Sequence, residues 1–175
     1  MKKTLFIFFS IIFSISVKAQ VTEAQKAQLI KDWERAKVYT GEYLAVIPAD
    51  QIDYKPHDSV RSIARQLLHM AQANYGLGAS GTGVASPILR NLETTPTAKS
   101  RDSTVYFINA SYDWVIDGIK KMTLANFDEK SKFFGFEESR YVWLLKAHEH
   151  QTHHRGQLTI YIRMLGLKPP QEKLF

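Results

Sequence analysis

The chain has 175 residues, with 23 lysines and arginines, 17 acidic residues, six histidines and no cysteine. The lack of cysteine excludes disulfide bonds, a thiolate nucleophile and any cysteine-bearing metal site, so a metal would have to bind to histidine, carboxylate or water. The net charge of +6 is dispersed along the chain and forms no basic stripe, which argues against nucleic acid as a partner.

The first 19 residues have the three parts of a cleavable signal peptide. Two lysines precede an apolar stretch from Leu5 to Val17, which closes at Val17-Lys18-Ala19. This stretch is short for a membrane span, which needs about 20 residues. We therefore expect cleavage before Gln20 and a mature protein that is periplasmic or secreted, without a membrane anchor. Removal of three lysines with this segment lowers the net charge from +6 to +3, and residues 20–175 are expected to form one domain.

Two helices are predicted in the first half of this domain. Apolar residues recur at helical spacing between Thr22, which is suited to cap a helix, and Pro48. A second helix is expected to begin at Asp58 or Ser59, after a connecting loop. We expect it to end in a flexible stretch that reaches about Thr97. This stretch starts with four glycines, Gly76, Gly78, Gly81 and Gly83.

The sequence of the second half of the domain predicts two more helices. The third has the most regular pattern, with apolar residues at alternating steps of three and four: Val105, Ile108, Tyr112, Val115, Ile119 and Met122. The short region 132–138 contains three phenylalanines, which we expect to cover one end of the molecule. The fourth helix is expected from Ser139 to Leu165, before Gly166. Four amphipathic segments with almost no strand pattern predict an all-α four-helix bundle.

Four of the six histidines lie within seven residues of the fourth helix, from His148 to His154. His150 and His154 share the face that carries the apolar residues of this helix. They lie one turn apart, so both rings can bind one ion. His148 and His153 point elsewhere. Burial of two rings without partners would cost about 1–3 kcal/mol each, whereas a metal satisfies both.

A third ligand must come from another helix, and two histidines remain. His57 follows a proline in a loop, which is typical of a solvated turn residue. His69 lies on the second helix beside its apolar positions and is the better candidate. Three neutral imidazoles leave coordination positions open, as in catalytic sites. Zinc or nickel is the expected ion, and iron(II) or cobalt would also accept these ligands.

The fourth helix also carries a family signature. The run His150-Gln151-Thr152-His153-His154-Arg155-Gly156-Gln157-Leu158 resembles the C-terminal signature of the DinB-like superfamily, the metal-binding four-helix bundles of the DinB/YfiT type. Weaker matches lie upstream: Trp33 and Arg35, Ile47-Pro48, Tyr54-Lys55-Pro56, Arg61-Ser62-Ile63 and Leu68-His69. The resemblance implies a metal triad at His69, His150 and His154, a divalent ion such as zinc or nickel, and frequent homodimers. It also implies activation of a low-molecular-weight thiol or of water, for transfer or hydrolysis of a small-molecule substrate.

Other residues of the signature have structural interpretations beside functional ones. Arg155 and Gln157 flank the metal face, so we expect them to bond to backbone or to a neighbouring helix, with a substrate role as the alternative. A glycine inside a helix, Gly156, predicts close approach of another segment. The glycines from 76 to 83 could shape the mouth of a pocket. No catalytic residue or general base stands out.

Three functions follow from these patterns. The first is a metal-dependent enzyme that catalyses hydrolysis or thiol transfer with the ion held by the three histidines. The second is a non-catalytic periplasmic protein that captures a metal or another ligand with the same residues. The third is an interaction scaffold whose histidines hold no ion.

Overall fold

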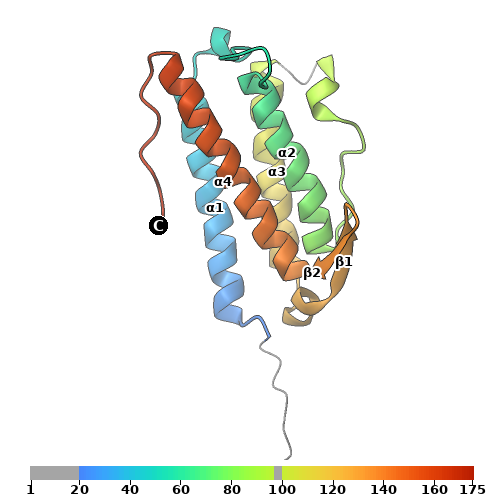
Figure 1. Cartoon of the computed structure of the whole chain (residues 1–175). Coiled ribbons are helices and arrows are strands. Elements are labelled where there is room, and N and C mark those ends of the chain that lie inside the picture. Colours follow the sequence, from blue (N-terminus) through green and yellow to red (C-terminus); the bar gives the residue numbers. More distant parts are fainter. Residues whose placement is uncertain (1–19, 97–99) are drawn as a thin grey trace, which may run out of the picture.

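The computed structural model describes residues 20–96 and 100–175, so the predicted signal peptide, residues 1–19, lies outside the described residues. Four helices run along one another (Figure 1): α1 Glu23–Val46, α2 Ile63–Thr82, α3 Arg101–Lys121 and α4 Arg140–Met164. The four predicted helices are thus confirmed. None of the helices in this part of the chain is long and apolar enough to cross a membrane.

A small antiparallel hairpin, β1 Lys130–Phe133 and β2 Phe136–Ser139, lies beside the start of α4 (Figure 1). It was not predicted, so the chain is mostly helical rather than purely so. Phe133 packs against Trp143, with ring centroids 6.0 Å apart. Phe134 and Phe136 are 85% and 68% exposed. The prediction that all three phenylalanines cover the end of the molecule is therefore wrong for two of them.

Side-chain caps determine where the helices begin. Thr22, Ser62, Ser100 and Ser139 each accept a hydrogen bond from the backbone N–H three residues later, which satisfies one of the free donors of the first turn. The cap at Ser62 means that α2 begins later than Asp58 or Ser59, where we expected it. The backbone N–H of Ile63 donates to Tyr54 O at 3.0 Å, which holds the start of α2 against the preceding loop.

The glycines of α2 do not end the helix, contrary to the prediction. The helix continues to Thr82, and Gly83 terminates it with a positive φ of 75°. A Cβ atom at Gly78 would lie 2.7 Å from Val115 Cγ2, and one at Gly81 would lie 2.6 Å from Leu144 Cγ. These glycines therefore allow α3 and α4 to approach α2 closely, and they form no flexible stretch.

The core lies between the four helices. Its largest fully buried side chains come from all four helices and from the flanking turns: Trp33, Leu67, Leu68, Leu92, Ile108, Tyr112, Ile119, Phe127 and Leu144. α2 packs against both α3 and α4, and α1 packs against the same two helices. The pairing of α2 with α4 brings together the two helices that carry the candidate ligands.

Candidate metal centre

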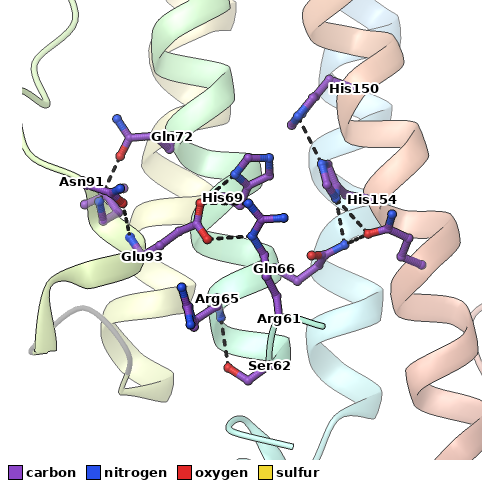
Figure 2. Close-up of polar contacts among 12 residues, drawn as sticks. Arg61, Ser62, Arg65, Gln66, His69, Gln72, Asn91, Glu93, His150 and His154 are labelled. Carbon is purple, nitrogen blue, oxygen red and sulfur yellow. Dashed lines mark hydrogen bonds and ion pairs between the residues drawn. The ribbon is translucent and has the colours of Figure 1, made fainter. Parts of the chain in front are cut away.

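The three histidines chosen from the sequence lie together between α2 and α4. His69 comes from α2, and His150 and His154 come from successive turns of α4 (Figure 2). One nitrogen of each ring lies within 4.8 Å of the other two. The ring centroids are 4.4–5.1 Å apart. The structure thus places all three rings where one ion could contact them, and ligation itself stays a prediction.

The spacing of the nitrogens fits a small transition metal. His150 Nε2 and His154 Nε2 lie 3.1 Å apart. Two nitrogens bound to zinc at about 2.0–2.1 Å in tetrahedral geometry are separated by roughly 3.4 Å. A shift of a few tenths of an ångström would therefore accommodate the ion.

Glu93 holds the ring of His69 in place. Glu93 lies in a short 3-10 helix, Leu92–Thr94. Its Oε1 accepts a hydrogen bond from His69 Nδ1 at 2.7 Å, and its Oε2 accepts one from Arg61 Nε at 2.6 Å (Figure 2). Because a carboxylate only accepts, His69 Nδ1 donates this bond, and in the neutral form of the ring the lone pair of Nε2 is the one available to an ion. Glu93 was not predicted.

Burial alone would raise the pKa of the Glu93 carboxyl. The hydrogen bonds that Glu93 accepts from Arg61 and His69, together with the charge of Arg61, outweigh this effect and lower the pKa below its ordinary value. Glu93 is therefore ionised at neutral pH. Since both of its oxygens are bonded, it orients His69 and is not free to act as a base.

Two glutamines contact the other ring nitrogen of His154. Gln157 Oε1 lies 3.1 Å from His154 Nδ1 and can accept its proton, which leaves Nε2 with a lone pair. Gln66 Nε2 lies 2.7 Å from the same nitrogen and also donates to Gln157. Because an amide N–H only donates, His154 Nδ1 carries its proton when it bonds to Gln157 and accepts when it bonds to Gln66. Gln157 therefore bonds to a neighbouring helix, as predicted, and to a proposed ligand as well. Gln66 is buried and was not predicted.

The ionisation of the rings suits a cation. Burial, and then the charge of the neighbouring imidazoles, lowers the pKa of His150 to about 4 and that of His154 to about 3. Both rings are neutral at pH 7, as metal ligands must be. His150 Nε2 and His154 Nε2 share a hydrogen bond of 3.1 Å in which either ring can donate, and His150 Nδ1 is buried without a partner. An ion would satisfy the facing nitrogens, so the residues present fit a divalent metal.

A cavity of about 630 Å³ adjoins this cluster. Gln66 and Gln157, which contact His154, form part of its wall, together with Arg61, Arg65 and Tyr161. Burial raises the pKa of the Tyr161 phenol, so this group stays protonated at neutral pH. None of the three histidines lines this cavity, and Gln66 and Gln157 connect its wall to His154. The glycines of α2 do not line it, so the expectation that they shape its mouth is wrong.

The other histidines lie outside the cluster. His57 is exposed and bonds to Ser59 Oγ at 2.8 Å through its Nδ1. His148 turns towards Trp33, with ring centroids 5.9 Å apart. His153 is exposed and bonds to Gln157 Nε2 at 2.9 Å, so it touches the residues that support the site.

The expectation that Arg155 bonds to a neighbouring helix is confirmed, whereas the expectation for Gly156 is not. Arg155 is buried and donates hydrogen bonds to side chains of α1, α3 and α4, away from the three imidazoles. A Cβ atom at Gly156 would meet nothing within 4 Å. The predicted close approach of another segment at Gly156 is therefore wrong.

The fold and the histidine cluster define a four-helix-bundle protein with a candidate His₃ metal centre. The sequence matches the DinB family over residues 17–174, and the chain belongs to that family. No curated protein matches the chain at a significant level.

Solved structures share the fold. A DinB-like protein of Bacillus cereus superposes with a TM-score of 0.72 at 19% identity, over 84% of this chain and 97% of that one. The DinB-like protein YjoA of Bacillus subtilis gives a TM-score of 0.63 at 23% identity, over 85% of this chain and 96% of the other. YfiT of Bacillus subtilis gives a TM-score of 0.65 at 14% identity, over 90% of this chain and 97% of the other. YfiT is described as a probable metal-dependent hydrolase with an unusual four-helix bundle topology. At these identities the likeness shows the fold alone.

Proposed function

We propose that this chain is a metal-dependent hydrolase in which His69, His150 and His154 hold one divalent ion, with zinc or nickel favoured over iron(II) and cobalt. The observation that carries the proposal is the convergence of three imidazoles, of which His150 and His154 are neutral at pH 7, close to a cavity. A bound ion with three imidazole ligands lowers the pKa of a coordinated water and so provides a nucleophile at neutral pH.

The chain's own residues supply orientation and substrate contacts. Glu93 and Gln157 fix two of the three rings, so the metal-binding nitrogens are arranged before an ion arrives. Arg65 and Tyr161 line the cavity and offer hydrogen-bond donors to a polar substrate. A small molecule with a hydrolysable carbonyl or phosphoryl group suits this lining.

Hydrolysis is favoured over thiol transfer by two considerations. YfiT, which shares the fold, is described as a probable hydrolase. We also propose that residues 1–19 direct export to the periplasm or beyond, where low-molecular-weight cytosolic thiols are not expected. Thiol transfer on the same ion is therefore the second enzymatic candidate. The non-catalytic alternative, capture of a metal or ligand, uses the same three residues. That the chain forms a homodimer stays a prediction, and analytical ultracentrifugation would test it.

The experiment begins with metal content. Protein purified without a nickel column is analysed by inductively coupled plasma mass spectrometry, beside His150→Ala and the matched control His57→Ala. We expect about one ion per chain in the wild type and in His57→Ala, and none in His150→Ala. A wild-type protein that binds no divalent ion at micromolar concentrations would contradict the proposal.

Activity separates the enzyme from the binding protein. The metal-loaded protein is screened against chromogenic esters, amides and phosphate esters, and against thiol acceptors with added thiol. Turnover that disappears in His69→Ala and persists in His57→Ala supports the hydrolase. Full metal occupancy with no turnover in any screen supports the non-catalytic alternative.

A further inference from the structure

A second cavity, of about 480 Å³, lies between α1, α4 and the C-terminal segment 169–174. The residues that α4 contributes to this cavity lie about half a turn around the helix from His150 and His154. They occupy positions 148, 152, 155, 156, 159 and 163. In Figure 1 the C-terminal segment runs back alongside α1. Arg35 Nη1 donates to Lys173 O at 2.6 Å, and Lys173 pairs with Glu42. This cavity is therefore separate from the candidate metal centre.

The lining includes a buried guanidinium, Arg155, which is only 6% exposed. Its four hydrogen bonds reach neutral oxygens of Thr40, Tyr112, Gln151 and Thr152, at 2.9–3.3 Å. Among the residues that the structure describes, no carboxylate forms an ion pair with it. Buried charges in proteins are normally paired with an opposite charge. An anion bound in the cavity would supply that charge.

The rest of the lining is also cationic. The permanent cations of the cavity are Arg35, Arg155, Arg163 and Lys173, against a single carboxylate, Glu172. Two acids next to the cavity are already paired, Asp32 with Arg35 at 3.1 Å and Glu42 with Lys173. Arg163 is exposed and has no ion pair within the described part of the chain. The cavity thus favours an anion over a neutral or cationic ligand.

Aromatic rings complete the wall. The Arg155 guanidinium lies over the ring of Tyr39, 5.4 Å from its centroid. Tyr43 OH bonds to Thr159 Oγ1 at 2.6 Å. His148 also lines the cavity, and its Nε2 is buried without a hydrogen-bond partner. Flat apolar surfaces beside charged donors suit an oxyanion group attached to a small organic body, and the volume is in the usual range of small-molecule sites.

We propose that this cavity binds a small organic anion whose carboxylate or phosphate group pairs with the guanidinium of Arg155, while its organic body packs against Tyr39. Arg35 and Arg163 contribute positive charge at the edge of the site. The planar, permanently charged guanidinium is suited to such oxyanions. The proposal does not depend on a metal at His69, His150 and His154.

Isothermal titration calorimetry of the purified protein tests the proposal. The probes are inorganic phosphate and benzoate, which separate the two head groups, and benzylamine, which keeps the ring but reverses the charge. We expect saturable one-to-one binding of at least one anion and none of benzylamine. The affinity should fall at least tenfold in Arg155→Met and in the double variant Arg35→Gln/Arg163→Gln. Arg90→Gln removes one positive charge outside the cavity, as Arg155→Met does inside it, and should leave the affinity unchanged.

Two further comparisons keep the result decisive. If Arg155→Met does not fold, the double variant carries the test, because its side chains are partly or fully exposed. His69→Ala should bind the anion as the wild type does, whether or not the metal centre exists. Loss of anion binding in His69→Ala would assign the anion to the histidine cluster and overturn the proposal. Equal affinity in the double variant and in Arg90→Gln, or no saturable binding of either anion, would also overturn it.

Discussion

Glu93 and His69 are joined by a hydrogen bond of 2.7 Å between Oε1 and Nδ1, across the gap between a 3-10 turn and α2 (Figure 2). Arg61 holds the second oxygen of the same carboxylate at 2.6 Å. Through this chain of contacts, a residue that touches no ion determines which nitrogen of His69 is free to bind one. The same carboxylate that orients the ring also increases its basicity as a ligand.

Glu93→Gln should therefore weaken metal binding while leaving all three histidines in place. We expect a loss of affinity of about 10- to 100-fold, the usual effect of removing a carboxylate behind a ligating imidazole. Competition with a chromogenic chelator measures it. Glu137→Gln on the exposed hairpin is the matched control. Equal affinities in the two variants would mean that Glu93 plays no part in ligation.

Removal of the ion should lower the melting temperature. A ligand at about 100 times its dissociation constant stabilises the folded state by about 2.7 kcal/mol, which corresponds to roughly 5–10 °C for a domain of this size. Differential scanning calorimetry with and without EDTA provides the comparison. His69→Ala should melt at the same temperature in both conditions, whereas His57→Ala should respond as the wild type does. A wild-type melting temperature that EDTA does not change would favour the scaffold without an ion.

Acid should destabilise the ion-free protein before it reaches the ordinary range of carboxyl titration. The pKa values of His150 and His154 are lowered by burial to about 4 and about 3, whereas an unfolded histidine titrates near 6.5. The unfolded chain therefore binds more protons below about pH 6.5, and stability falls as the pH drops from there towards 4.

Because His150 is partly solvated and the two rings titrate as a contacting pair, we expect a loss on the order of 2 kcal/mol in the free energy of unfolding over that interval. Urea denaturation of EDTA-treated protein at pH 7.5 and pH 4.5 measures it. His150→Ala/His154→Ala should show a smaller loss over the same interval. A double variant with the same pH dependence as the wild type would assign the effect to other groups.

The glycines of α2 and α4 should respond in opposite ways to alanine. At Gly81 the new Cβ would lie 2.6 Å from Leu144 Cγ and 3.2 Å from Leu144 N, so α4 would have to move. We expect Gly81→Ala to destabilise the fold by about 1–3 kcal/mol. Gly156 has open space around it, so Gly156→Ala should stabilise its helix by about 0.5–1 kcal/mol. Urea denaturation of the two variants measures both changes. A Gly81→Ala variant that is as stable as the wild type would contradict the packing described for α2.

Spacing along a helix was sufficient to find the three candidate ligands. Positions 150 and 154 share the apolar face of α4, and few histidines remained to complete the set, so His69 followed from the sequence pattern. Ser139 and Gly166 delimited the same helix correctly to within about a residue. Local periodicity carries this information because a helix repeats every 3.6 residues whatever surrounds it.

Contacts between distant segments could not be read in that way. A glycine in a helical pattern can mark the end of the helix or a place where another helix packs closely. At Gly81 it marks close packing, because Leu144 of α4 lies against it. Gly156 was assigned a close approach that does not exist. Glu93 lies in an irregular segment, where no periodicity shows which way a side chain points. Gln66 lay on a predicted helix, but only the packing of α2 on α4 places it next to His154.

The positions of the three histidines along the chain also affect how the molecule would open. An ion shared by His69 and His150 would close a loop of about 80 residues, which contains all of α3 and the hairpin, in a chain with no cysteine to make such a closure. Closing a long loop reduces the entropy that the unfolded chain can gain. α1 lies outside this loop and contributes no ligand. In the metal-bound protein, the backbone amides of α1 would therefore exchange with solvent deuterium before those of the other three helices.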